Sequence, residues 1–347
     1  MTVSVASHPV TKQRGSDFAA LSKRIKSAGL LERRHGFYAW RMSVTVSLFA
    51  AGWVALAVLG HSWWSVAVAA YLAIVSTQLG FLGHDAGHHQ IFRTRKPNDV
   101  VGLVNANLLT GLSYGWWVTK HNRHHKNPNH EGMDPDISPG ALAFTGEDTR
   151  ARSGLARAVT KYQAWFFFPL LTLEALNLHV ASVRALVNGE VRRTAVESVL
   201  LAVHLVAYLG GLVLLLSPLQ ALVFVLVHQG VFGIYLGCSF APNHKGMPTL
   251  TKAQELDFLR RQVLTSRNVR GGWFVDNLLG GLNHQIEHHL FPSMPRPNLG
   301  KATDLIKQFC AERDIPFAET TLLDSYAQVL RHLDDAGAGR ETPRLAR

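Results

Sequence analysis

The sequence is short of cysteine and of charged residues. Its two cysteines, Cys238 and Cys310, form no CxxC pair, so we expect neither a disulfide framework nor a cysteine-held metal site. Charged residues make up 17% of the 347 positions, below the roughly 25% of a typical soluble domain. Residues 1–40 are polar and basic and lack the apolar core of a cleavable signal peptide. With 47% hydrophobic residues, the composition indicates a membrane protein.

Long apolar runs occur in four places, and each approaches the ~20 residues that cross a bilayer. They cover about residues 43–60, 64–83, 194–216 and 219–240, and so predict two helical hairpins. The connectors HSWW (61–64) and SPLQ (217–220) contain no Lys or Arg. Basic residues instead precede the first run or lie between the hairpins: Lys12, Arg14, Lys23, Arg24, Lys26, Arg33, Arg34, Arg41, Arg93, Arg95, Lys96, Arg192 and Arg193. Because Lys and Arg favour the cytoplasmic side, we expect both termini and the central segment there.

Two further apolar segments do not read as spans. Residues 100–118 contain Asn105, Asn107 and glycines, and residues 165–176 are short and contain a proline. Both suit helices that lie in the membrane interface. We expect the polar tail from Asp334 onward to be disordered. The net charge of +11 fits a basic membrane face, since no nucleic-acid-binding motif accompanies it and we expect no nucleic-acid partner.

Histidines gather in four short windows at or beyond the ends of the apolar runs, all on the expected cytoplasmic side. The windows read GHDAGHHQ, KHNRHHKNPNHEG, FAPNHKGMP and NHQIEHHLFP. They hold eleven of the eighteen histidines: His84, His88, His89, His121, His124, His125, His130, His244, His284, His288 and His289.

The spacing within these windows suits metal binding. On a helix, residues three and four apart share a face, so the pairs His84/His88, His121/His124 and His121/His125 can each point at a common centre. Neutral imidazole is a common ligand of iron and zinc. One window alone is as readily structural, but four windows on one side of the membrane favour metal ligands.

The number of candidate histidine ligands helps to distinguish iron from zinc. Catalytic zinc usually takes about three protein ligands, whereas these windows offer eight or more. The zinc-protease pattern HExxH is absent, because Asp134 stands where His130-Glu131 requires a second histidine. His204 and His228 are lone histidines within spans, which more often hydrogen-bond between helices than hold a haem. Two non-haem irons suit the set best, and such a site can activate O2 beside membrane hydrocarbon.

The boxes HDAGHH, HNRHHKNPN…DPDI and QIEHHLFP together resemble the integral-membrane fatty acid desaturases, in particular the branch whose third box begins with glutamine. The likeness covers roughly residues 38–317, leaving an N-terminal cytosolic arm (1–37) and a C-terminal cytosolic tail (318–347). It implies an all-α integral membrane fold with four transmembrane helices in two hairpins. A cytosolic helical cap would hold a dimetal site beneath a kinked acyl tunnel.

The resemblance also implies a set of iron ligands. Carried over position by position, they are His84, His88, His121, His124, His125, His244, His288 and His289. The sequence departs from the wider family at Gln285, which stands where most members have histidine. By register with HNRHH, Gln285 takes the slot of His121 as a weak ligand, and His284 lies beside the site. Helical spacing keeps the other assignment open, because His284 and His288 are also four residues apart.

Other residues near the boxes have weaker assignments. His89 and Asp85 are candidates for weak ligands or for hydrogen-bond partners of ligands. Asp134 and Asp136 can accept hydrogen bonds from ligand imidazoles, or can simply cap helices and turns. Tyr114, Trp116 and Trp117 precede the second box and can line the acyl tunnel or anchor an interfacial helix; the two explanations carry equal weight.

The activity implied by the resemblance is the O2-dependent introduction of a double bond, usually cis, into an acyl chain of an acyl-CoA or acyl-lipid. No haem-domain tetrapeptide HPGG, no GxGxxG fingerprint and no cysteine set for an iron–sulfur cluster occur in the sequence. We therefore expect a separate electron donor, either a ferredoxin with its flavin reductase or a flavin–iron–sulfur oxidoreductase. We expect the plasma membrane of a bacterium, with membrane lipids around the spans and the active site on the cytoplasmic side.

Three other functions compete with this interpretation. A membrane hydroxylase, epoxygenase or carotenoid-modifying oxygenase uses similar histidine boxes and differs in its product. A metal transporter would carry polar metal-binding residues within several spans, whereas these windows lie outside the hydrocarbon region. A basic nucleic-acid-binding membrane protein is the weakest alternative, because no recognition motif supports it.

Overall fold

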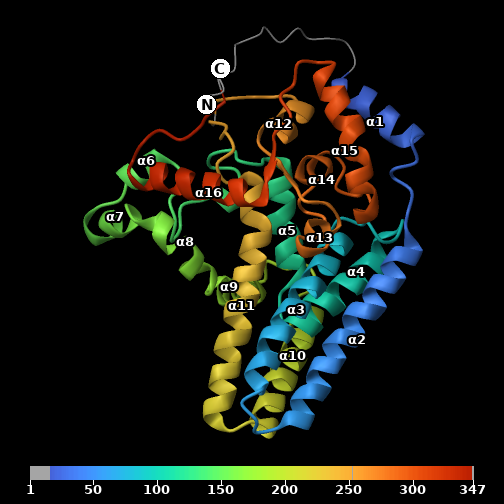
Figure 1. Ribbon diagram of the computed structural model, residues 1–347, viewed down its shortest axis with the longest axis vertical. Coiled ribbons are helices and arrows are strands. Elements are labelled where there is room, and N and C mark those ends of the chain that lie inside the picture. Colours follow the sequence, from blue (N-terminus) through green and yellow to red (C-terminus); the bar gives the residue numbers. More distant parts are fainter. Residues whose placement is uncertain (1–15, 252, 346–347) are drawn as a thin grey trace.

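Four long helices form the membrane bundle of the computed structural model, which describes residues 16–251 and 253–345. Figure 1 shows them as the lower part of the molecule, with the shorter helices gathered above. Each is long and apolar enough to cross a membrane: α2 (His35–Leu59), α3 (Ser65–Gly87), α10 (Thr194–Leu215) and α11 (Pro218–His244). The two predicted hairpins and the all-α fold class are confirmed.

The helices differ from the predicted spans at the ends nearest the shorter helices. α2 begins eight residues before the predicted start at position 43, while α3 and α11 each continue four residues past the predicted ends at 83 and 240. The extensions carry His84 and His244, so these histidines belong to the last turns of α3 and α11. Polar side chains end an apolar run in the sequence, but they do not end the helix.

α3 is the central helix of the bundle and buries the largest share of its residues among the four. It packs closely against α2 at Gly52, where an added Cβ would lie 2.5 Å from Cδ2 of Leu72. Leu56, Leu72, Leu212 and Phe224 form a buried cluster that joins all four helices. This packing fixes the positions from which the histidines project.

The cap consists of short helices and one small parallel sheet. Its elements are α1 (Asp17–Ser27), α12 (Phe258–Leu264), β1 (Asn268–Arg270), α13 (Gly272–Leu278), α14 (Gln285–Leu290), α15 (Arg296–Ala311), β2 (Glu319–Thr321) and α16 (Leu322–Gly337), and β1 pairs with β2.

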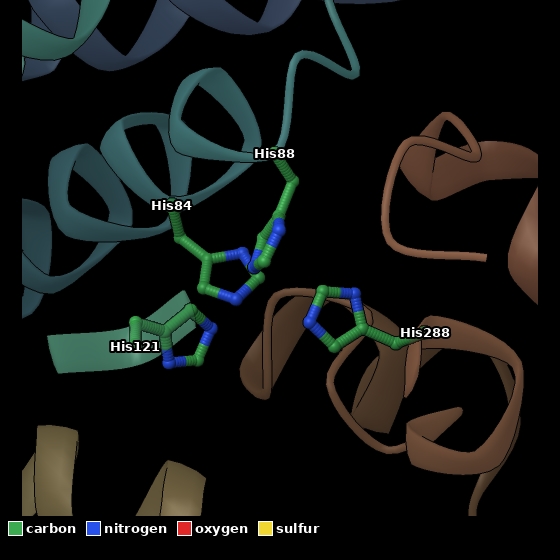
Figure 2. A group of neighbouring side chains, drawn as sticks. All are labelled: His84, His88, His121 and His288. Atoms are coloured by element: carbon green, nitrogen blue, oxygen red, sulfur yellow. The ribbon is translucent and has the colours of Figure 1, made fainter. Parts of the chain in front are cut away.

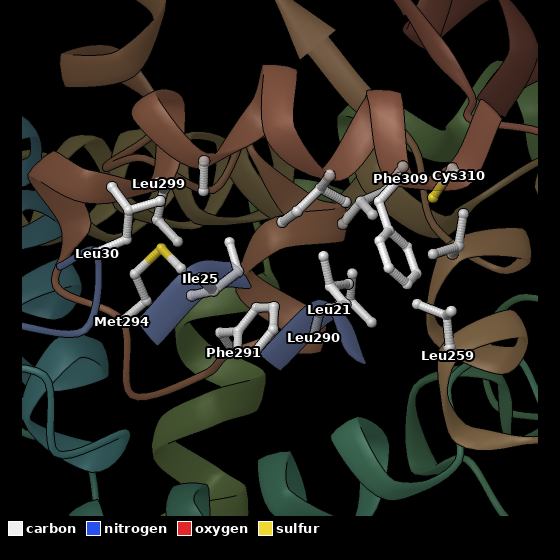
Figure 3. Packing of buried hydrophobic residues seen from close by; sticks show 14 of the residues in the cluster. Leu21, Ile25, Leu30, Leu259, Leu290, Phe291, Met294, Leu299, Phe309 and Cys310 are labelled. Atoms are coloured by element: carbon white, nitrogen blue, oxygen red, sulfur yellow. The ribbon is translucent and has the colours of Figure 1, made fainter. Parts of the chain in front are cut away.

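The largest buried cluster of the cap lies around α14 and is shown in Figure 3. Leu21 and Ile25 of α1 pack with Leu259, Leu290 and Phe309 of α12, α14 and α15. Burying each such side chain contributes roughly 1.5–3 kcal/mol relative to leaving it in water. The core therefore holds α14 in place by Leu290, while the histidines of the same short helix face the histidines of other elements.

Eight short elements connect the two hairpins: α4 (Arg95–Leu103), the π-helix η1 (Val104–Thr110), α5 (Tyr114–Lys126), the 3-10 turn η2 (Pro135–Ile137), α6 (Gly146–Arg150), α7 (Gly154–Thr160), α8 (Gln163–Leu171) and α9 (Glu174–Val187). Residues 100–118 thus do not form the single interface helix that we predicted. The π-helix is packed against α3 and α10, and the buried Asn107 donates a hydrogen bond of 3.1 Å from Nδ2 to Glu197.

The second predicted interface segment, residues 165–176, contains a bend. α8 and α9 meet at an angle of 70°. Both helices expose large apolar side chains, with Trp165 of α8 80% and Leu176 of α9 54% exposed. Because this apolar face is exposed, we still predict that the segment lies in the membrane interface.

The prediction of a disordered tail from Asp334 is wrong for the residues that the structure describes. α16 continues to Gly337 and buries Leu333 and Ala336. Beyond the helix, Arg344 forms a bridge with Thr249. The polar composition of the tail concealed this packing, because only one face of α16 needs to be apolar.

Candidate metal centre

Eight histidines from four elements point their rings into one buried region at the junction of the bundle and the cap. The last turn of α3 contributes His84, and His88 is the cap residue that follows this helix. Helix α5 contributes His121 and, one turn later, the adjacent His124 and His125. His244 ends α11, and α14 supplies His288 and His289. Every one of the predicted ligand histidines is in this region.

The first group of histidines consists of His84, His88, His121 and His288. One ring nitrogen from each lies within 4.8 Å of the others, so a single ion could bind all four. Figure 2 shows the four rings converging from the α3 end, α5 and α14. The Nε2 atoms of His84 and His88 are buried and have no hydrogen-bond partner among residues 16–251 and 253–345. Unpartnered buried nitrogens of this kind fit a metal ion.

The second group consists of His124, His244 and His289, whose ring nitrogens also lie within 4.8 Å of one another. Nε2 of His244 lies 3.3 Å from Nε2 of His124 and 3.0 Å from Nε2 of His289. Two adjacent groups within one site are the arrangement that two metal ions require.

The tautomers of the second group can be assigned from the opposite ring nitrogens. Nδ1 of His124 lies 3.0 Å from Asp134, Nδ1 of His244 lies 3.0 Å from the Thr265 carbonyl, and Nδ1 of His289 lies 2.9 Å from Oε1 of Gln262. Each partner is an acceptor, so each Nδ1 carries the proton and each Nε2 presents a lone pair. Three lone pairs facing one another repel, and a cation between them removes the repulsion. The donor set therefore fits a metal ion.

His125 lies between the two groups. Its Nε2 is 3.1 Å from Nε2 of His121 and 3.1 Å from Nε2 of His288, while its ring stacks on that of His289 with 4.1 Å between centroids. Its nitrogen therefore belongs with the first group, which then offers five imidazoles.

Burial keeps most of these histidines neutral. It lowers the pKa of His88, His121, His125, His288 and His289 well below the ordinary value, and the neighbouring histidines lower it further. Neutral imidazole is the form that binds metals. His124 differs: burial also opposes its charge, but the carboxylates of Asp134 and Asp136 raise its pKa.

Asp134 and Asp136 lie behind His124, on the Nδ1 side. Together with His124 they could hold an ion of their own, but that would use the nitrogen opposite to the second group. Asp134 also accepts hydrogen bonds from the backbone N–H groups of Asn129 and Asp136. These contacts describe a carboxylate that orients a histidine.

Gln285 and His284 are placed differently by α14. Gln285 is the first residue of the helix and is buried, with its amide nitrogen 2.8 Å from Nε2 of His244. Its Oε1 has no partner, and exchanging the two amide atoms would direct that oxygen towards the second group. His284 is the residue before the helix and contacts Asp276 at 3.1 Å and Thr303 at 3.2 Å.

The remaining candidates lie at the edge of the site. Asp85 approaches Nδ1 of His84 to 3.6 Å. His89 has a left-handed backbone (φ +55°) and belongs to neither group of converging nitrogens among the described residues. His130 likewise joins neither group, and its Nδ1 lies 3.2 Å from the carbonyl of Glu131.

A cavity of about 420 Å³ adjoins both groups of histidines. Its lining includes His84, His121, His124, His244 and Gln285. Tyr114, Trp116 and Trp117, the residues suggested for a tunnel, line it as well. Lys120 and Lys245 also line it, which no pattern in the sequence indicated. Both lysines contact Asp136: Lys120 pairs with the carboxylate of Asp136, and Lys245 donates a hydrogen bond to the backbone carbonyl oxygen of Asp136.

A second cavity of about 320 Å³ lies among the membrane helices and shares Thr110 with the first. Phe49, Trp53 and Gly211 line it, together with His228. His228 is hydrogen-bonded at Nδ1 to Tyr208 at 3.2 Å, which agrees with the predicted role of lone span histidines between helices. The shared residue makes the two cavities neighbours.

Known proteins similar to this chain are desaturases. A family model described as "Fatty acid desaturase" matches residues 61–321. The "Acyl-lipid (9-3)-desaturase" of the moss Physcomitrium patens is 32% identical over 315 residues, which are 86% of this chain and 58% of the moss protein. The "Delta(6)-fatty-acid desaturase" of Caenorhabditis elegans is 30% identical over 93% of this chain and 75% of its own length. A "Delta(8)-fatty-acid desaturase" of Euglena gracilis is 30% identical over 91% of this chain and 78% of its own length.

Proposed function

The chain belongs to the fatty acid desaturase family, and from that premise we propose that it introduces a double bond into a fatty acyl chain at a pair of iron ions. The reaction converts a CH2–CH2 unit into CH=CH while O2, two electrons and two protons become two molecules of water. The observation that supports it most is the pair of adjacent histidine groups beside a cavity. Two irons, when bound, would supply the O2 activation that abstraction of hydrogen from an unactivated methylene needs.

The ligands that we propose follow the two groups. One iron takes His84, His88, His121, His125 and His288, and the other takes His124, His244 and His289. Gln285 completes the second set as a weak ligand through its amide oxygen or through a water molecule, because it approaches His244 to 2.8 Å. His284 stays outside both sets, since its ring faces Asp276.

The first cavity is the place that we propose for the acyl chain next to the irons. Every methylene of a saturated chain is chemically alike, so the enzyme must select one C–C bond by holding the chain in one position. Trp117 is suited to this task because it lines the cavity and stacks on His121 with 4.4 Å between ring centroids. The second cavity continues past Thr110 and has room for the methyl end.

The polar mouth of the first cavity gives the acyl ester or thioester a place to lie. Lys120, Asp136 and Glu174 line it, together with Asn177. Their formal charges, with Lys245, sum to zero, which suits an uncharged carbonyl group. We keep acyl-CoA and acyl-lipid as the two substrate classes; the moss relative is by its name an acyl-lipid enzyme.

The electrons come from a separate protein in this proposal. The sequence contains no HPGG tetrapeptide, no GxGxxG fingerprint and no cysteine set for an iron–sulfur cluster, whereas the segments on the side of the histidines are rich in Lys and Arg. We propose that a ferredoxin with its reductase, or a flavin–iron–sulfur oxidoreductase, docks on this face. By the same charge bias the metal centre lies on the cytoplasmic side of the membrane.

Product analysis tests the proposal. The chain is expressed in a host without desaturases, and its total fatty acids are compared with those of a host that expresses His288→Ala. We expect a new unsaturated fatty acid only with the unaltered chain. A hydroxylated or epoxidised product would instead assign the chain to a sister oxygenase, and unchanged fatty acids with a functional donor present would contradict the proposal.

A further inference from the structure

Arg296 is a buried arginine that lies outside the histidine boxes. It is the first residue of α15, and 8% of its surface is exposed. Its Nη2 lies 2.6 Å from Oδ2 of Asp85, which is 2% exposed. Gly281 (φ +80°) leaves room for the arginine, since a Cβ there would lie 2.7 Å from Arg296 Cγ. The fold thus accommodates a buried ion pair between α15 and the end of α3.

Asp85 connects this ion pair to the first group of histidines. Its other carboxylate oxygen, Oδ1, lies 3.6 Å from Nδ1 of His84. The opposite nitrogen of His84, Nε2, has no hydrogen-bond partner in the part of the chain that the structure describes. A carboxylate beside Nδ1 of a metal-binding histidine fixes the orientation of the ring and raises its basicity. Two residues, Asp85 and His84, therefore separate Arg296 from the proposed first iron.

The backbone of Arg296 is anchored independently of its side chain. Its N–H donates to the Tyr38 hydroxyl at 3.1 Å, and that hydroxyl donates to Gln90 at 3.0 Å. The Gln90 side chain in turn donates to the Pro292 carbonyl at 2.9 Å. These bonds join α2, the end of α3 and the start of α15. A substitution of the Arg296 side chain leaves all of them in place.

The charges of the pair act on the iron in opposite directions. The carboxylate of Asp85 stabilises the higher positive charge of oxidised iron, and the guanidinium of Arg296 cancels that effect. In a buried site such charges are screened little by water. Without the arginine, the carboxylate would be unpaired and free to turn away from His84.

We propose that Arg296 is a positioning residue of the metal centre, which holds Asp85 against His84 and sets the reduction potential of the irons by neutralising that carboxylate. The inference rests on the proposed function, because it takes His84 as an iron ligand. It assigns to a residue beyond the third box a role in tuning the chemistry at the first box.

The test compares four variants with the unaltered protein: Arg296→Met, Arg296→Lys, Asp85→Asn and the double variant Asp85→Asn/Arg296→Met. Iron per chain and the midpoint potential are measured in detergent by an electron paramagnetic resonance titration. We expect Arg296→Met to shift the potential in the negative direction and Asp85→Asn to shift it in the positive direction. The double variant and the charge-preserving Arg296→Lys should both return towards the original value.

Opposite signs distinguish this role from a purely structural one. If the two single variants move the potential in the same direction, or leave it unchanged while iron is retained, the inference is wrong. If Arg296→Met does not accumulate, the other two single variants still test the inference. Asp85→Asn should shift the midpoint potential, and Arg296→Lys should not. The titration needs no acyl substrate, so an absent desaturated product would contradict the proposed function and not this inference.

Discussion

Nδ1 of His124 lies 3.0 Å from both carboxylate oxygens of Asp134, and both side chains are buried. The two residues are ten positions apart. Asp134 stands directly before the 3-10 turn η2 and also caps it, by accepting a hydrogen bond from the backbone N–H of Asp136. His124 is consequently held with Nε2 towards His244 and His289. This geometry suits a residue that orients a ligand of the proposed metal centre without being a ligand itself.

Replacing Asp134 by asparagine should weaken metal binding at the second group. The amide is a poorer acceptor than the carboxylate, so His124 loses its fixed orientation. We expect the iron affinity to fall by about 10–100-fold, as is usual for such hydrogen-bond partners, which competition with a chelator would measure. Asp148→Asn is the control, because Asp148 caps α6 and contacts no histidine of the site. Equal iron retention in both variants would contradict the assigned role.

The register of the third box predicts a contrast between two neighbouring histidines. His284→Ala should retain most iron and some activity, because its ring contacts Asp276 and Thr303 rather than the histidine groups. His288→Ala should abolish activity. Gln285→His should retain iron, and Gln285→Ala should impair turnover without unfolding the protein. Iron analysis and a melting curve of each variant provide the measurement, and a loss of iron in His284→Ala as complete as in His288→Ala would show that the register is wrong.

The purified protein should carry about two irons per chain and little zinc. Eight imidazoles in two groups, seven of them buried, exceed the roughly three protein ligands of a catalytic zinc site. Elemental analysis of protein purified without metal-affinity chromatography measures both metals. Stoichiometric zinc and no iron after growth in iron-rich medium would argue against a diiron centre.

Turnover should require an added electron donor and should fall as ionic strength rises. A basic face attracts an acidic donor, and salt screens that attraction over about 8–10 Å at physiological ionic strength. Oxygen consumption with NAD(P)H, a ferredoxin and its reductase is measured across a series of NaCl concentrations. Full activity with NAD(P)H alone would show that no separate donor protein is required. A rate that does not change with salt concentration would contradict electrostatic docking of the donor.

Two adjacent glycines of α10 offer a matched test of the second cavity. Gly211 lines it, and a Cβ there would lie 3.3 Å from Cζ3 of Trp53, whereas a Cβ at Gly210 would meet nothing within 4 Å. Gly211→Val should lower the yield from long acyl chains relative to shorter ones, because it narrows the space for the methyl end. Gly210→Val makes the same change in helix propensity and should leave the chain-length profile unaltered. Identical profiles in the two variants would exclude the cavity as part of the substrate path.

The sequence was most informative about the spans and about the residue types of the metal centre. Apolar runs of about 20 residues are visible without tertiary information, so the two hairpins could be predicted. The convergence of the histidines could be anticipated only in part. Helical spacing relates His121 to His125, but no local rule relates either to His288, since packing of α14 on the cap core brings them together.

Other features could not be predicted because they depend on single long-range contacts. Arg296 resembles any surface arginine until Asp85 is found 2.6 Å away. The conflict between His284 and Gln285 depended on where the helix of the third box begins. α14 begins at Gln285, and His284 has non-helical angles (φ −93°, ψ 59°), so its spacing of four from His288 does not place the two on one face.

The metal centre is built on the ends of membrane spans, and this has a consequence for how the bilayer acts on it. His84 lies in the last turn of α3 and His244 is the final residue of α11, two spans that pack against each other. Spans adapt to a thicker or thinner bilayer by changing their tilt. Because His84 belongs to the first group of histidines and His244 to the second, a change in the relative tilt of α3 and α11 would alter the separation of the two groups. Lipids of different chain length would therefore change the distance between the two groups of proposed ligands. An enzyme that alters the acyl chains of a membrane would in this way respond to the thickness of that membrane.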